Sequence, residues 1–137
     1  ACNKTVNATT TGTIEINNSP MTYWPNAFCT WTLSGMVPNK ISLQVLNLPY
    51  ENFNFTGVCL SDYVEVYDGQ NSSSHLLGRY CQDKPVLGTI RSTGNIMHIV
   101  FRSDRLNEKG FLKAKYTAYN YPACKQDLTV LNERQII

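Results

Sequence analysis

One run, Cys59-Leu-Ser-Asp-Tyr-Val-Glu-Val-Tyr-Asp-Gly69, constrains the fold of this chain more than any other segment. Apolar and polar residues alternate from Asp62 to Tyr67, which is the pattern of a half-buried β-strand, and the Asp-Gly pair that follows is typical of a turn. A second segment, Phe101-Arg-Ser-Asp104, ends in an acidic loop before a closing Gly-Phe strand. Together the two segments predict a disulfide-linked β-sandwich whose carboxylates gather at one end. Such a cluster needs a cation and has no evident use as a catalyst.

Short alternating runs dominate the rest of the chain, and helical periodicity is almost absent. The predicted strands are 11–16, 28–33, 41–48, 62–67, 76–80, 87–91, 96–101 and 111–117. Gly, Pro and Asn residues separate them, which favours an all-β fold, an antiparallel sandwich, over a parallel α/β fold. Within 62–67 we expect Val64 and Val66 to face the core and Glu65 to be a solvated strand residue, with Asp68 forming the turn.

The composition limits the domain organisation and the partners. The chain has 137 residues, 16% of them charged, and a net charge of +2 with Lys and Arg scattered, so binding to nucleic acid or anionic membranes is not expected. No apolar stretch approaches a membrane span, and no signal-like segment opens the chain, as in a mature or excised fragment. Residues 1–119 are predicted to form one domain, and 120–137 a linker and the start of a following module.

Cysteines and glycosylation sequons indicate an extracellular setting. Five Asn-X-Ser/Thr sequons begin at Asn3, Asn7, Asn17, Asn54 and Asn71. Five cysteines without Cys-X-X-Cys spacing or paired histidines favour disulfides over zinc. The odd one, Cys124, is either a free thiol, an intermolecular one, or the mate of a cysteine in a following module, which we favour. The sequence therefore predicts a secreted or cell-surface glycoprotein.

These features resemble the CUB domain, the extracellular β-sandwich module of complement-initiating proteases, tolloid-type metalloproteases, cubilin, spermadhesins and neuropilins. The matching segments are Cys2, Gly12-Thr-Ile14, Ser19-Pro20, Tyr23-Trp-Pro25, Cys29-Thr-Trp-Thr-Leu33, Ile41-Ser-Leu-Gln-Val45, Cys59…Gly69, Leu77-Gly-Arg-Tyr-Cys81, Ser92-Thr-Gly-Asn95, Phe101-Arg-Ser-Asp104 and Gly110-Phe111. They cover about residues 2–117 in order. The chain departs from the family pattern in a shorter stretch between residues 19 and 29 and a longer loop over 52–58.

The resemblance implies a jelly-roll-like sandwich with disulfides Cys2–Cys29 and Cys59–Cys81. It also implies one calcium ion bound at one edge, with the side chains of Glu51, Asp62, Asp104 and Asn107 and the carbonyl of Arg105 as ligands. In calcium-binding members the same acidic edge accepts a Lys or Arg of a protein partner. Carried over to this sequence, that partner site comprises Tyr23, Glu51, Asp62 and Asp104.

The sequence thus predicts a non-catalytic, extracellular, calcium-binding module for protein recognition, with a role in cell adhesion among those it fits. The alternatives are a structural or oligomerisation unit of a multi-CUB array and an accessory domain of a secreted protease. No hydrolase, protease or nucleotide-binding signature is present, and His75 and His98 have no metal-spaced partner. Lys109, Lys113 and Lys115 alternate with apolar residues in the last strand, which favours a solvated face over a heparin-like contact.

Overall fold

The fold is given by a computed structural model that describes residues 2–16, 28–49, 59, 62–81, 84–103 and 110–120. Over these ranges the chain forms nine β-strands and no helix. The strands are β1 (Cys2–Ala8), β2 (Thr11–Ile16), β3 (Phe28–Gly35), β4 (Lys40–Pro49), β5 (Tyr63–Asp68), β6 (His75–Tyr80), β7 (Ile90–Arg91), β8 (Ile96–Arg102) and β9 (Gly110–Tyr119).

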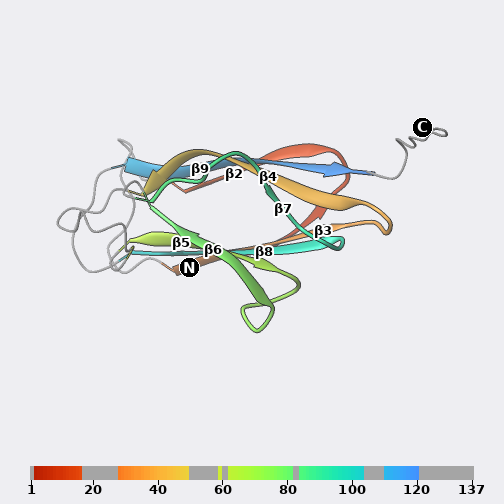
Figure 1. The fold of residues 1–137 in the computed structure, drawn as a ribbon, viewed down its shortest axis with the longest axis horizontal. Coiled ribbons are helices and arrows are strands. Elements are labelled where there is room, and N and C mark those ends of the chain that lie inside the picture. The colour runs from red at the N-terminus through yellow and green to blue at the C-terminus, as the bar shows by residue number, and fades with distance from the viewer. Residues whose placement is uncertain are drawn as a thin grey trace, which may run out of the picture.

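The strands make two sheets that pack face to face (Figure 1). One has five strands in the order β1-β3-β8-β5-β6, and the other has four in the order β2-β9-β4-β7. The predicted all-β sandwich is therefore confirmed.

Side-chain alternation along each strand sends one set of residues into the space between the sheets. Leu33, Ile41, Val66, Ile99 and Phe101 are among the side chains with no exposed surface. They come from β3, β4, β5 and β8, so both sheets contribute to one core. The faces predicted for Val64 and Val66 are those observed.

The first strand was not predicted, and it is not antiparallel. β1 runs parallel to β3 at the edge of the five-stranded sheet, with Cys2 opposite Cys29 and Ala8 opposite Gly35. Its sequence is mostly polar, and among its described side chains only Val6 and Ala8 show substantial burial toward the core. An edge strand with so little apolar character gives a weak alternation signal, which explains the omission.

The strand predicted over 87–91 was too long. β7 comprises only Ile90–Arg91, because Gly88 has a φ of 90°, in the left-handed region that an extended strand does not use. Leu87 is 93% exposed, so the apolar residue that suggested a longer strand contributes nothing to the core.

The sandwich has two distinct ends. β4 stops at Pro49 where β9 starts at Gly110, and Tyr63 at the start of β5 pairs with Arg102 at the finish of β8. These strand ends lie together on the left of Figure 1, and we call this the Asp62 end. The opposite, far end is held by short turns.

Hydrogen bonds tie the turns of the far end together. Asp68 accepts from the backbone N–H and the hydroxyl of Thr93, at 2.9 and 2.8 Å. The buried Ser92 hydroxyl accepts from the backbone N–H of Ile41 at 2.8 Å and donates to the carbonyl of Gly94 at 2.7 Å. Asp68, predicted only as a turn former, therefore also anchors the loop before β8.

Candidate functional site

Asp62 is the one predicted side-chain calcium ligand that lies within the described residues. It directly precedes β5 and has no exposed surface. Because Tyr63 pairs with Arg102 in an antiparallel ladder, Asp62 occupies the position next to Ser103, which is also buried. Glu51, Asp104, Arg105, Asn107 and Tyr23 lie outside the described residues.

A disulfide fixes the approach to Asp62. Cys59 and Cys81 are bonded, with their Cα atoms 5.8 Å apart, and both are buried. This is one of the two bridges that the resemblance implied. Cys29 is also disulfide-bonded, and its backbone pairs with that of Cys2, whose side chain is outside the described set.

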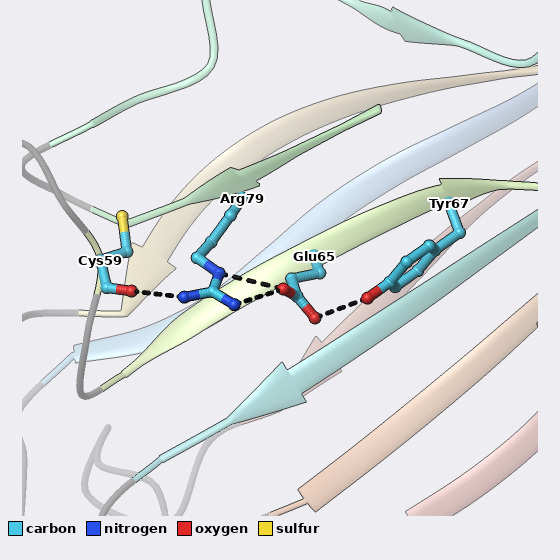
Figure 2. Close-up of polar contacts among 4 residues, drawn as sticks. All are labelled: Cys59, Glu65, Tyr67 and Arg79. Carbon is cyan, nitrogen blue, oxygen red and sulfur yellow. Dashed lines mark hydrogen bonds and ion pairs between the residues drawn. The ribbon is translucent and has the colours of Figure 1, made fainter. Parts of the chain in front are cut away.

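A charged network beside this disulfide connects β5, β6 and the segment that leads to Asp62 (Figure 2). Arg79 on β6 donates from Nε and Nη2 to Oε2 of Glu65, at 2.9 and 2.8 Å. Its Nη1 donates to the carbonyl of Cys59 at 3.1 Å, and its guanidinium carbon lies 4.1 Å from the centre of the Tyr63 ring. The Tyr67 hydroxyl donates to Oε1 of Glu65 at 2.8 Å.

The prediction that Glu65 is solvated was wrong. Glu65 does lie on the outward face of β5, as the alternation requires, but it is only 7% exposed. The register places Arg79 directly opposite Glu65, and Tyr67 supplies a third donor to its carboxylate. A buried carboxylate needs such donors, and here the neighbouring strand provides most of them.

This network was missed in the sequence because its partners are fourteen residues apart. The only available signal was that Glu65 and Arg79 belong to consecutive predicted strands of a hairpin. The pairing also crosses a bulge between Val66 and Tyr67, so the register could not be counted from the turn alone.

The network continues toward β8 and β3 through aromatic and hydroxyl groups. The Tyr67 and His98 rings are 6.2 Å apart, and the His98 Nδ1 is 2.9 Å from the Thr32 hydroxyl. Burial is the main factor that raises the pKa of Tyr67, with the hydrogen bond to Glu65 second. Burial also lowers the pKa of His98. His98 thus lies on the polar face of its strand, but it is partly withdrawn from water.

Three of the five sequons can be located. Asn3 and Asn7 are exposed on β1, and Asn71 is exposed in the turn between β5 and β6. The Asn3 side-chain oxygen accepts from the Thr30 hydroxyl at 2.9 Å, so Asn3 lies on the outward side of the five-stranded sheet. Asn17 and Asn54 are outside the described residues.

The donor chemistry at the Asp62 end fits a hard cation. Calcium takes about six to eight oxygen ligands, and a carboxylate removed from water by burial is a suitable first one. Within the described ranges no group of three His, Cys, Asp or Glu side chains gathers, but the remaining predicted ligands fall in the segments 50–58 and 104–109. Those segments follow β4 and precede β9, whose ends meet at this edge.

The described geometry is that of a disulfide-linked β-sandwich, and comparison with protein families identifies its class. The model of the CUB domain matches residues 2–116, and the chain belongs to this family.

Curated relatives are much longer than this chain. Pig (Sus scrofa) cubilin is 38% identical over 109 residues, which are 79% of this chain and 3% of cubilin. Bovine (Bos taurus) inactive serine protease PAMR1 is 36% identical over 124 residues, which are 88% of this chain and 16% of that protein. The chain therefore spans only a small part of the curated relatives it matches.

Solved structures share the fold. The CUB1-EGF-CUB2 domains of rat MASP-1 align with a TM-score of 0.69 and 23% identity, covering 92% of this chain and 46% of that one. The MASP-1 CUB2 domain bound to Ca²⁺ aligns with a TM-score of 0.66 and 24% identity, covering 82% and 96%.

Membership of the CUB family indicates a role in protein interaction but does not identify the ligand. The CUB domain is a non-catalytic module that also occurs in proteases, and in multidomain extracellular proteins it mediates contacts with protein partners and neighbouring domains. Homologous CUB proteins are extracellular or secreted. The described part of this chain contains no helix long and apolar enough to cross a membrane.

Proposed function

We propose that this chain is an extracellular recognition module that binds calcium at the Asp62 end and accepts a basic residue of a protein ligand there. Glu51, Asp62 and Asp104 would supply carboxylates, Asn107 its side-chain oxygen and Arg105 its carbonyl. Tyr23 would border the ligand site. The sequons, if occupied, would make the protein a glycoprotein.

The observation that carries this proposal is the complete burial of the Asp62 carboxylate where two antiparallel strands end. Burying a charge is costly unless cations or hydrogen-bond donors compensate it. The calcium-bound MASP-1 CUB2 domain has the same fold, which supports calcium as one such cation at this end.

The chain's own residues keep the carboxylate in place. Asp62 is three residues from Cys59, whose sulfur is bonded to Cys81 and whose carbonyl accepts from Arg79. The backbone on the other side of Asp62 enters the β5 ladder at once. Calcium, when bound, would supply the positive charge that allows several carboxylates to lie together, and carboxylate oxygens remaining outside its shell would accept from a Lys or Arg of the ligand.

The test is thermal and urea unfolding with about 2 mM calcium or with EDTA. For a dissociation constant of roughly 10⁻⁴–10⁻³ M, the range of extracellular modules, linkage predicts about 0.6–1.8 kcal/mol of added stability. Asp62→Asn should abolish this increment. Asp68→Asn, which removes a carboxylate at the far end, should lower stability but keep the increment.

An unchanged melting curve for the unmodified chain would refute the calcium assignment. A calcium increment lost in Asp62→Asn, but with no preference for Lys-containing peptides over matched Gln peptides, would favour the structural role in an array over ligand recognition.

A further inference from the structure

The outward face of the four-stranded sheet carries a row of cations that the proposed function does not use. Residues 113, 115, 117 and 119 of β9 point away from the core, because Leu112 and Ala114 are buried and Tyr116 and Ala118 pack against the core. Ile41 and Leu43 are buried in the same way on β4, and Ile90 on β7. The outward cations of this sheet are therefore Lys40, Arg91, Lys113 and Lys115.

Strand register spreads these cations along the sheet. Lys40 pairs with Tyr119, Ser42 pairs with both Thr117 and Arg91, and Lys115 pairs with Gln44. Outward-facing residues that pair across the strands form rows, and successive rows from the far end contain Lys40, then Arg91, then Lys115, then Lys113. Rows are about 6.8 Å apart along a strand, so the four cations span roughly 20 Å. Glu15, opposite Lys113, is the only acidic residue among the described outward positions of these strands.

The cations border a hollow lined by hydroxyl groups. A cavity of about 750 Å³ is lined by Lys40, Ser42, Arg91, Thr93, Thr117 and Tyr119. The buried Ser92 also lines this hollow, and its hydroxyl bonds β4 to the loop after β7. Cations with hydroxyl donors between them fit a ligand that carries both fixed negative charge and sugar hydroxyls.

We propose that this face binds sulfated glycosaminoglycan chains. Protein interfaces are depleted in Lys and rich in aromatic and apolar anchors. The described outward positions of this face are mostly Lys, Thr, Ser and Gln with one Arg, and the large apolar or aromatic side chains among them are Leu46 and Tyr119. Single-stranded nucleic acid requires several aromatic stacking platforms, which are also missing from the described residues of this face. Sulfate groups stay ionised at any physiological pH, so a basic row attracts them over a wide range.

The location of the sequons agrees with this assignment. Asn3 and Asn7 are on β1 of the other sheet, and Asn71 is in the β5–β6 turn. None of the described sequons is on the four-stranded sheet, so glycans attached at these sites would leave the basic face uncovered. The inference depends on the extracellular setting of the family and is independent of calcium binding at the Asp62 end.

The experiment measures binding of the chain to immobilised heparin, and to desulfated heparin, over a range of salt concentrations. The test variant combines Lys40→Gln, Arg91→Gln and Lys115→Gln. The matched control combines Lys4→Gln, Lys84→Gln and Arg102→Gln, which removes the same charge from exposed positions off this face. Circular dichroism and melting of each variant establish that it folds.

We expect heparin binding that is unaffected by EDTA and absent with desulfated heparin. The test variant should bind on the order of tenfold more weakly, since each exposed ion pair contributes a factor of about 1.4 to 5. Its log affinity should also fall less steeply with log salt, by about one per cation removed. The control variant should stay within about twofold of the unmodified chain.

Equal losses in the test and control variants would overturn the proposal, because they would mean attraction by net charge alone. Unchanged binding in a folded test variant would overturn it as well. Equal competition by polyglutamate or by DNA of matched charge would assign the face to another polyanion. A test variant that fails to fold is replaced by Arg91→Gln and Lys115→Gln singly, both at exposed positions, which should each weaken binding about twofold or more.

Discussion

Replacing Arg79 with Ala should destabilise the protein far more than an exposed arginine normally would. The Arg79 side chain is 39% exposed, but the Glu65 side chain that it pairs with is only 10% exposed. The substitution removes two charged hydrogen bonds to Glu65, one to the Cys59 carbonyl and the stack over Tyr63. In the variant, the Glu65 carboxylate would keep only the Tyr67 hydroxyl among the donors described above.

The magnitude follows from these contacts. Leaving a fully buried ion without its partner costs about 3–5 kcal/mol, and hydrogen bonds to charged groups contribute about 1.5–3 kcal/mol each without adding fully. Because Arg79 is partly solvated, screening reduces the effect. We expect a loss of about 2–3 kcal/mol for Arg79→Ala. Arg79→Lys should lose about half of this, since the ammonium cannot reproduce the planar fork.

Urea unfolding followed by circular dichroism measures the effect, and a double-mutant cycle with Glu65→Gln isolates the coupling, expected at about 1–2 kcal/mol. Arg102→Ala is the matched control, because Arg102 also stacks on an aromatic ring, Phe28 at 4.5 Å, but is itself exposed. It should change stability by less than about 0.5 kcal/mol. Equal losses for Arg79→Ala and Arg102→Ala, or a coupling near zero, would refute the reasoning.

Three further predictions concern other parts of the sandwich. Replacing Cys59 and Cys81 together by Ala opens a loop with a sequence separation of 22 and should cost about 3 kcal/mol in unfolding free energy, measured with urea; a loss below about 1 kcal/mol would contradict it. Ser92→Ala removes a buried hydroxyl that links β4 to the loop before β8, and should cost about 1–3 kcal/mol, whereas Thr93→Ala at the exposed neighbouring position should cost less. Burial lowers the pKa of His98 in the folded protein below its ordinary 6.5. The free energy of unfolding therefore has its full value from this residue above pH 6.5, and that contribution is lost as the pH falls from 6.5 through the lower pKa of the folded state. His98→Gln should therefore flatten the decline in stability from about pH 7 to 5, and an unchanged pH profile in the folded variant would contradict the assignment.

The sequence predicted the core strands because their apolar residues alternate with period two, and this pattern needs no partner to be recognised. It failed at β1, whose place depends on pairing with β3 rather than on its own apolar content. It also failed at the β7 segment, where the backbone of Gly88 interrupts the strand.

The candidate sites were only partly accessible to such reasoning. Asp62 was located because the Asp-Tyr-Val motif is contiguous, and it proved fully buried. The calcium role of Asp62, like that of the other predicted ligands, stays a prediction. The Glu65–Arg79 pair depends on hairpin register, and the basic face depends on the order β9-β4-β7, so Lys113 and Lys115 could not be connected with Lys40 and Arg91 from spacing alone.

The parallel pairing of β1 with β3 has a consequence for proteins that contain several such modules. Cys2 lies at the Asp62 end and Tyr119 at the far end, as the registers of β1 and β9 require (Figure 1). In a protein with modules before and after this one, the polypeptide would enter the sandwich at the Asp62 end and leave it at the far end. The ten residues of β9 extend about 34 Å, so each added module would lengthen the protein by about that distance. Equivalent surfaces of successive modules would then be spaced regularly along the protein.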